Sequence, residues 1–176
     1  MRREPESLVR TLLLILLLTA PTLARAQYYE EHRAVSLMAG PGLGYTNSIR
    51  GSQAQTGAGL LLDVGGSLTV GYEQDELFLL ARGGFGPAGK GGVLLGGFRG
   101  FFGSDEWQSF FDVGATVRLF SGTWAGPRLG FGLRRTLSDR LSLYGGFGLS
   151  LGFGSGLRID AEASTGLQWS FPIGPR

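Results

Sequence analysis

The sequence predicts an all-β fold, an eight-stranded antiparallel up-and-down transmembrane β-barrel preceded by a cleaved signal peptide. Along Leu141–Phe153, leucine and phenylalanine recur at alternate positions, and glycine, serine and tyrosine stand between them. Seven other segments repeat this alternation, and most reach the roughly 9–11 residues that a tilted strand needs to cross a bilayer. One large apolar face and one small or polar face are typical of a closed barrel in lipid.

A soluble barrel of the lipocalin kind is the alternative, and it would reverse the two faces. Its outer wall would be charged, yet only 17% of the residues are charged and Lys90 is the one lysine. The face opposite the leucines is mostly glycine and serine, and the chain has 32 glycines. This composition favours a barrel whose wall faces lipid.

The N-terminus has the pattern of a secretory leader. A basic start with Arg2 and Arg10 precedes the apolar run Leu12–Leu18, and Ala24–Ala26 supplies an A-x-A cleavage site. A transmembrane anchor would need about 20 apolar residues, which is longer than this run. We therefore predict a signal peptide over residues 1–26, with signal cleavage after Ala26, and a polar lead-in over 27–33.

Charge and cysteine content exclude several function classes. The chain has 16 Lys+Arg and 14 Asp+Glu, and the leader takes four arginines together with Glu4 and Glu6. The mature chain is thus left with 12 of each sign and no basic cluster, so we expect no nucleic-acid partner. Without cysteine there is no disulfide, thiolate nucleophile, thiolate metal site or lipid anchor on a cysteine.

The first two strands are expected over 34–45 and 57–72. Leu37 and Leu43 share the outer face of the first strand, in which Pro41 suits an edge or a bulge. The polar residues 46–56 between the strands predict the longest connection of the barrel.

The next three strands are expected over 77–86, 91–102 and 109–120. Outward leucine, valine and phenylalanine side chains of the first and third of these oppose inward arginine and aspartate. The segment 91–102 has apolar residues on both faces, so its inside and outside stay open, and a β-bulge would account for it. Acidic or glycine-rich residues at 73–76, 87–90 and 103–107 predict the turns.

The last three strands are expected over 127–135, 141–153 and 157–171. Arg158, Asp160 and Glu162 share the inner face of the final strand, opposite Leu157 and Ile159. The barrel therefore spans 34–171, and 172–176 form a short C-terminal tail. An even number of strands returns both ends to one side, which we assign to the periplasm together with the turns after strands two, four and six.

Aromatic residues gather near the expected strand ends, as in the interfacial girdles of membrane barrels. The interfacial aromatics predicted in this way are Tyr45, Tyr72, Trp107, Phe120, Trp124, Trp169 and Phe171.

In this arrangement the chain resembles the small eight-stranded outer-membrane barrels of Gram-negative bacteria, the OmpA/OmpX-like class. Barrels of this class usually end in an aromatic residue that the assembly machinery reads, with apolar residues two and four positions before it. Leu167, Trp169 and Phe171 fit that alternation, whereas the tail 172–176 departs from it. The resemblance implies the bacterial outer membrane as location, and outer-membrane lipid and the assembly machinery as partners. We expect a monomer.

Three sequence patterns imitate catalytic or nucleotide-binding motifs and are rejected. Gly84–Lys90 matches G-x-x-x-x-G-K and contains G-x-G-x-x-G, but Gly91 and a strand follow where Ser or Thr and a helix are required. Gly148–Gly152 matches G-x-S-x-G, but its Ser150 lies within a regular strand rather than at a sharp turn. The single histidine, His32, lies outside the barrel. We expect no catalytic, cofactor or metal site, and a lipid-A-modifying hydrolase is the least favoured reading.

Charged residues on the inner faces are the strongest candidates for function. Opposite charges in a narrow and poorly solvated lumen should pair, because an unpaired buried charge is costly. The predicted lumenal charge network is Asp63, Arg82, Arg99, Asp112, Arg118, Arg134, Arg158, Asp160 and Glu162. A structural plug is favoured, in a non-enzymatic outer-membrane barrel protein with a structural or surface-interaction role. A narrow channel for ions or small solutes is the alternative.

Overall fold

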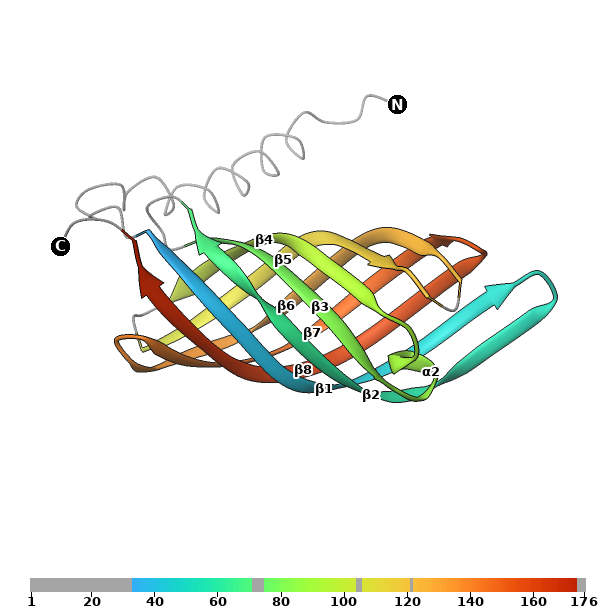
Figure 1. Cartoon of the computed structure of the whole chain (residues 1–176), viewed down its shortest axis with the longest axis horizontal. Helices are drawn as coiled ribbons and strands as arrows, with labels where there is room; N and C mark the ends of the chain where they lie inside the picture. Colours follow the sequence, from blue (N-terminus) through green and yellow to red (C-terminus); the bar gives the residue numbers. More distant parts are fainter. Residues whose placement is uncertain (1–32, 71–74, 104–105, 121, 174–176) are drawn as a thin grey trace, which may run out of the picture. The chain divides into compact units, whose positions relative to one another are not determined.

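The computed structural model describes residues 33–70, 75–103, 106–120 and 122–173 (Figure 1). Eight antiparallel strands form a closed barrel in which each strand pairs with the next and the last pairs with the first. The elements are β1 (Ala34–Arg50), β2 (Gln53–Thr69), β3 (Glu76–Phe85), α2 (Gly86–Gly89), β4 (Val93–Gly103), β5 (Trp107–Arg118), β6 (Trp124–Ser138), β7 (Leu141–Gly154) and β8 (Leu157–Pro172). The predicted all-β closed barrel is confirmed. The predicted signal peptide, its cleavage site, Tyr72 and residues 174–176 lie outside the described residues.

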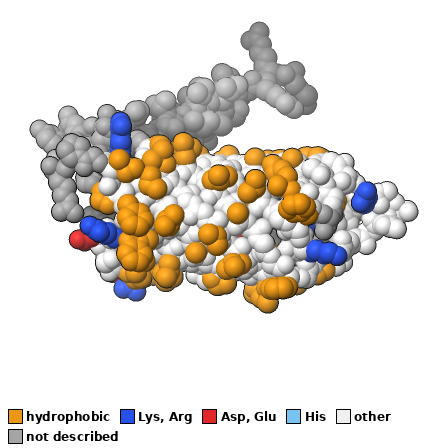
Figure 2. Space-filling model, in the orientation of Figure 1, with side chains coloured by type: hydrophobic (Ala, Val, Ile, Leu, Met, Phe, Trp, Pro, Cys, Tyr) orange, Lys and Arg blue, Asp and Glu red, His pale blue; other side chains and the backbone are white. Residues whose placement is uncertain are grey.

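Alternation along the strands sorts the side chains into an apolar wall and a mixed interior. Leu37, Leu43, Phe147 and Leu149 are about 60% exposed, while their neighbours point inward and are largely buried. On the face seen in Figure 2, charged side chains lie only near the two ends of the barrel, and hydrophobic ones cover the wall between them. Among the described residues, no helix is long and apolar enough to cross a membrane.

The first hairpin is longer than the sequence predicts. Residues 46–56 were expected to form a polar loop, but Thr46 pairs with Gly57 and Arg50 pairs with Gln53. The turn is only Gly51 and Ser52, and Gly51 has a φ of 59°, which favours glycine. In Figure 1 this hairpin extends past the ends of the other strands. A strand outside lipid can be polar on both faces, so hydrophobic alternation does not reveal it.

The connection after β3 and the course of β4 also differ from expectation. The expected loop over 87–90 is replaced by the short helix α2, which has a proline in its first turn. β4 pairs with β3 and β5 without a break, so the expected bulge there is wrong. The register shift found among the described strands lies between Thr136 and Ser138 of β6. β6 begins at Trp124 and ends at Ser138, so both of its turns are shorter than expected.

An apolar and aromatic cluster fills part of the lumen. Its buried members come from β1, β3, β4, β5 and β7, namely Met38, Phe78, Leu80, Val93, Leu95, Phe101, Phe110 and Tyr144. We call the end with Ala34 and Pro172 the terminus end, and the end with the β1–β2 hairpin and α2 the hairpin end. The charged side chains lie inside the barrel between and beside these apolar groups.

Candidate functional site: the charged lumen

Arg82 and Asp63 form a two-pronged ion pair inside the barrel. The two residues are register partners on β3 and β2, and both face inward. Arg82 Nε and Nη2 donate to the two Asp63 carboxylate oxygens at 2.6 and 2.7 Å. Such bidentate contacts fix geometry as well as charge. The remaining Arg82 nitrogen, Nη1, donates to Glu162 of β8, so the pair is linked to a strand that neither residue's own strand pairs with.

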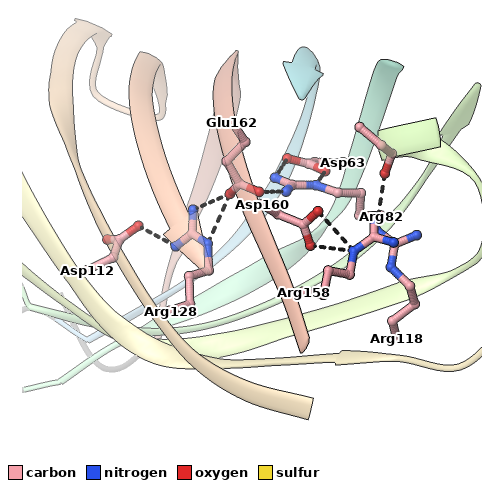
Figure 3. A network of polar contacts seen from close by, with 9 residues as sticks. Asp63, Arg82, Asp112, Arg118, Arg128, Arg158, Asp160 and Glu162 are labelled. Atoms are coloured by element: carbon pink, nitrogen blue, oxygen red, sulfur yellow. Dashed lines mark hydrogen bonds and ion pairs between the residues drawn. The ribbon is translucent and has the colours of Figure 1, made fainter. Parts of the chain in front are cut away.

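Glu162 extends this contact into a chain of ion pairs. Arg128 of β6 donates from Nε and Nη2 to Glu162 Oε1 at 3.0 and 2.7 Å, and from Nη1 to Asp112 at 3.3 Å. Asp112 in turn accepts from Arg99 of β4 at 2.7 and 3.1 Å. Figure 3 shows most of this chain crossing the lumen. We call Asp63, Arg82, Glu162, Arg128, Asp112 and Arg99 the central charge network.

Glycines on the inner face make room for the central charge network. A Cβ at Gly148 of β7 would lie 2.6 Å from both Arg128 Nη2 and Glu162 Oε1. A Cβ at Gly130 would lie 3.2 Å from Arg128 Nη1 and from Asp112 Oδ2. The small residues that alternate with the leucines therefore allow long charged side chains to meet across a narrow barrel.

Aromatic rings surround the Arg99 end of the network. The Arg99 guanidinium carbon lies 4.2 Å from the centre of the Phe110 ring, 5.2 Å from Phe78 and 5.8 Å from Tyr144. The negative faces of these rings stabilise the cation. The sequence pattern did not decide which face of β4 is the inner one, and the structure places the side chain of Arg99 inside the barrel. The inner face of β4 is otherwise apolar because it contributes to the aromatic cluster of the lumen.

A second polar group lies toward the terminus end. Arg134 Nη1 donates to Glu76 at 2.9 Å, and Arg134 Nε donates to Gln108 at 3.0 Å. The amide of Gln168 donates to the same Glu76 oxygen at 2.6 Å. Arg134 also lies 3.7 Å from the centre of the Phe101 ring. The turn predicted over 73–76 is wrong for Glu76, which begins β3 and is 2% exposed.

A third group, at the hairpin end, contains Arg118, Arg158, Asp160 and Trp124. Arg158 Nε donates to both oxygens of Asp160 at 2.9 and 2.8 Å, and its guanidinium lies 5.6 Å from the Trp124 ring. Arg118 donates to the backbone carbonyls of Lys90 and Ala88, beside α2. The prediction of Trp124 as an interfacial aromatic is wrong, because it points into the lumen and is 6% exposed.

The structure thus places every predicted lumenal residue inside the barrel, and Asp160 is the most exposed of them. The sequence pattern did not identify Glu76, Gln108 and Arg128 as lumenal, whereas Gln168 lies on the inner face of the last strand, as alternation predicts. The inward position of Arg128 could have been predicted from the sequence. Arg128 stands two residues before Gly130, so it shares the inner face of its strand with Arg134. Outside the lumen, Tyr45, Trp107, Phe120, Trp169 and Phe171 point outward and are exposed, as girdle residues would be.

The lumen offers little for catalysis. Ser150 is buried in β7, and His32 lies outside the described residues. In the described part of the chain, no cluster of three or more His, Cys, Asp or Glu side chains could hold a metal ion. The groups present are guanidinium–carboxylate pairs, which neutralise and cross-link rather than transfer protons.

Comparison with known proteins agrees with this architecture. No protein-family model and no curated protein sequence matches the chain. Among solved structures, the N-terminal β-barrel domain of Pseudomonas aeruginosa OprF matches with a TM-score of 0.54 and 14% identity, covering 81% of this chain and all of that one. Neisserial surface protein A matches with a TM-score of 0.51 and 11% identity, over 78% of this chain and 99% of that one.

A de novo designed transmembrane β-barrel matches with a TM-score of 0.50 and 14% identity, over 77% of this chain and 95% of that one. The chain has the fold of the small outer-membrane β-barrels. The predicted resemblance is therefore confirmed as a likeness of fold, which identities this low do not extend to function.

Proposed function

We propose that the chain is a monomeric, non-enzymatic barrel of the bacterial outer membrane, exported by a leader that is cleaved after Ala26. Its role is structural or surface-interacting, and its lumen is plugged by the charged and aromatic groups described above. The apolar outer wall supports the membrane location, because an exposed belt of leucine and phenylalanine is stable in lipid and not in water. On this proposal, Leu167, Trp169 and Phe171 present the signal that the assembly machinery reads.

The dense packing of side chains in the lumen is the observation that supports the proposed plug. The central charge network links side chains of β2, β3, β4, β5, β6 and β8. The cavity beside Arg82 and Arg118 has a volume of about 20 Å³, which is room for roughly one water molecule. A conduit for hydrated solutes would need a continuous path much wider than this, so the plug is favoured over the channel.

Conductance across planar lipid bilayers tests the plug. Purified barrel is first shown to be folded by its faster migration on denaturing gels without boiling, and is then added to the bilayer. We expect no current steps above those of the empty bilayer, for the natural chain and for Arg158→Ala. Reproducible steps from the natural chain would overturn the plug in favour of the channel.

The long β1–β2 hairpin supports a surface role in addition. β2 first pairs with β3 at Leu60, and α2 packs against residues 57–59, so Gln53–Thr56 leaves one strand edge open. Gln53, Gln55 and Thr56 are exposed on it. An open polar edge can pair with an extended segment of another molecule.

A hairpin-shortened variant separates the two roles. Removal of residues 47–49 and 54–56 keeps the register of β1 with β2 and the Gly51 turn, but it also removes three pairs of β1 with β8, so folding of the variant is first checked by its gel shift on boiling. If the role is structural only, this variant should restore detergent resistance to cells that lack the protein as well as the full chain does. Restoration by the full chain alone would assign the function to the hairpin.

A further inference from the structure

Charge is not balanced inside the barrel. Among the described residues, six arginines are buried in the lumen, and five of them contact a carboxylate, whereas Arg118 contacts only backbone carbonyls. The carboxylates that serve these pairs are five, namely Asp63, Glu76, Asp112, Asp160 and Glu162. The described lumen therefore holds one more positive than negative charge, and the excess is at Arg118.

The two backbone carbonyls accept hydrogen bonds from Arg118, but as neutral groups they do not neutralise its positive charge. Arg118 is 5% exposed, so water does not screen it well. A guanidinium does not lose its proton in a protein, and an uncompensated buried charge is costly. Asp160 and Glu162 line the same cavity as Arg118, but each is paired with another arginine, so Arg118 has no carboxylate of its own.

The neighbours of Arg118 offer unused hydrogen-bond donors. Arg158 Nη2 and Trp124 Nε1 are buried and have no acceptor among the described residues. Trp124 is the register partner of Arg118, and a Cβ at Gly152 would lie 3.1 Å from Trp124 Cβ and 3.6 Å from Arg158 Cβ. Figure 3 shows Arg118 and Arg158 close together at this end of the lumen. Arg118 and the two residues with unpaired donors thus lie at the same end of the lumen. Arg158 Nη2 and Trp124 Nε1 can only donate hydrogen bonds, so they cannot pair with each other.

We propose that the hairpin end of the lumen binds one small monovalent anion of the halide class, held by Arg118, Arg158 and Trp124. The anion supplies the missing negative charge and the missing acceptor. Of these three residues only Arg118 lines the nearby cavity of about 20 Å³, which has room for a single ion of about the size of water. Asp160 and Glu162 also line that cavity, but each is already paired with at least one arginine.

Thermal unfolding of the purified full barrel in detergent tests the proposal. Chloride is exchanged for gluconate at constant ionic strength, so that only the nature of the anion changes. A ligand that binds only the folded state raises its stability, so we expect the Tm to rise by roughly 5 °C between 1 and 300 mM chloride. Absence of any chloride dependence in the natural chain would overturn the proposal.

Arg118→Gln is the decisive variant, because its amide keeps a donor for the carbonyls and removes the charge. We expect its Tm to be independent of chloride. Arg50→Gln is the matched control, since Arg50 is exposed at the tip of the β1–β2 hairpin, and it should keep the full chloride response. An equal response in Arg118→Gln and the natural chain would show that chloride acts elsewhere.

Quenching of tryptophan fluorescence by bromide gives a second measurement that does not need Arg118→Gln to fold. We expect a saturable component of quenching in the natural chain, and its loss in Trp124→Phe, which keeps Trp107 and Trp169. Quenching that rises linearly with bromide in both proteins would overturn the proposal.

Discussion

At Glu162, one carboxylate accepts hydrogen bonds from two guanidinium groups that belong to different strands. Glu162→Gln keeps the shape of the side chain and removes its charge, so Arg82 and Arg128 each lose part of their compensation. Breaking a buried ion pair on one side costs about 3–5 kcal/mol, and we expect a loss of that order in the free energy of unfolding. Urea unfolding of the barrel in lipid vesicles measures it.

Glu106→Gln provides the control for this loss. Glu106 contacts Arg135 at 3.4 Å, and the two side chains are 67% and 46% exposed. Exposed ion pairs contribute about 1 kcal/mol or less, so the control should unfold almost as the natural chain does. Equal losses in both variants would mean that the lumen is hydrated and that burial does not strengthen its ion pairs.

The residues of the lumen were predictable as far as strand periodicity reaches. Arg82, Asp112 and Glu162 follow from alternation alone, since each lies on the face opposite the apolar residues of its strand. Their partners do not follow from it, because pairing across the barrel depends on the register and curvature of all eight strands. The prediction for Trp124 was wrong for a related reason. The residue was expected in a loop before the sixth strand, but β6 starts at Trp124, and alternation along β6 then points its side chain inward.

Among the strand pairs, closure of β1 on β8 depends on a close backbone approach at Gly40. A Cβ at Gly40 would lie 1.9 Å from the carbonyl oxygen of Thr165 and 2.4 Å from Cα of Gly166. Neither backbone atom can move without separating the strands, so we expect Gly40→Ala to destabilise the barrel by roughly 1–3 kcal/mol. Urea unfolding in lipid vesicles again provides the measurement.

Gly83→Ala is the matched substitution, because a Cβ at Gly83 would meet nothing within 4 Å. It should change the free energy of unfolding by less than about 0.5 kcal/mol. If Gly40→Ala changed the free energy of unfolding as little as Gly83→Ala, the backbones of β1 and β8 would have to be farther apart at Gly40 than the structure places them.

The last strand carries the proposed assembly signal, and Phe171 is its terminal aromatic residue. Phe171 is outward, exposed and stacked on Trp169, with ring centres 6.2 Å apart. We expect Phe171→Ala to reduce the folded fraction of newly made protein several-fold, measured as the band that shifts on boiling. Phe153→Ala removes an outward phenylalanine of β7 that is 53% exposed, against 43% for Phe171, and should leave that fraction unchanged. Equal reduction by both variants would mean that lost outer apolar surface, and not a signal, limits assembly.

Strands were predictable where one face is apolar, and their ends were not. The central parts of all eight strands lie where alternation indicates, but the β1–β2 hairpin continues through polar residues and α2 interrupts a glycine-rich turn. A polar strand beyond the membrane and a polar loop have the same composition, and only pairing between Thr46 and Gly57 and their neighbours distinguishes them.

Over the whole molecule, the outer wall determines where the barrel is stable. The cost of an arginine on a lipid-facing position depends on its depth, at about 2–4 kcal/mol near the middle of the bilayer and about 0–1 near the interfaces. Leu149 lies near the middle of β7, and Leu137 lies next to the end of β6; both point outward and are well exposed. Both positions carry leucine, so the same Leu→Arg substitution at each compares two depths in the bilayer without any other difference in the side chains exchanged.

We expect Leu149→Arg to lower the free energy of unfolding in phospholipid vesicles by about 2–4 kcal/mol, and Leu137→Arg by about 1 kcal/mol or less. The difference should vanish in a detergent micelle, if the micelle deforms around a charged side chain. An arginine that costs little at both positions in vesicles would mean that the wall is not buried in hydrocarbon. The membrane location would then be wrong, even though the closed barrel would stand.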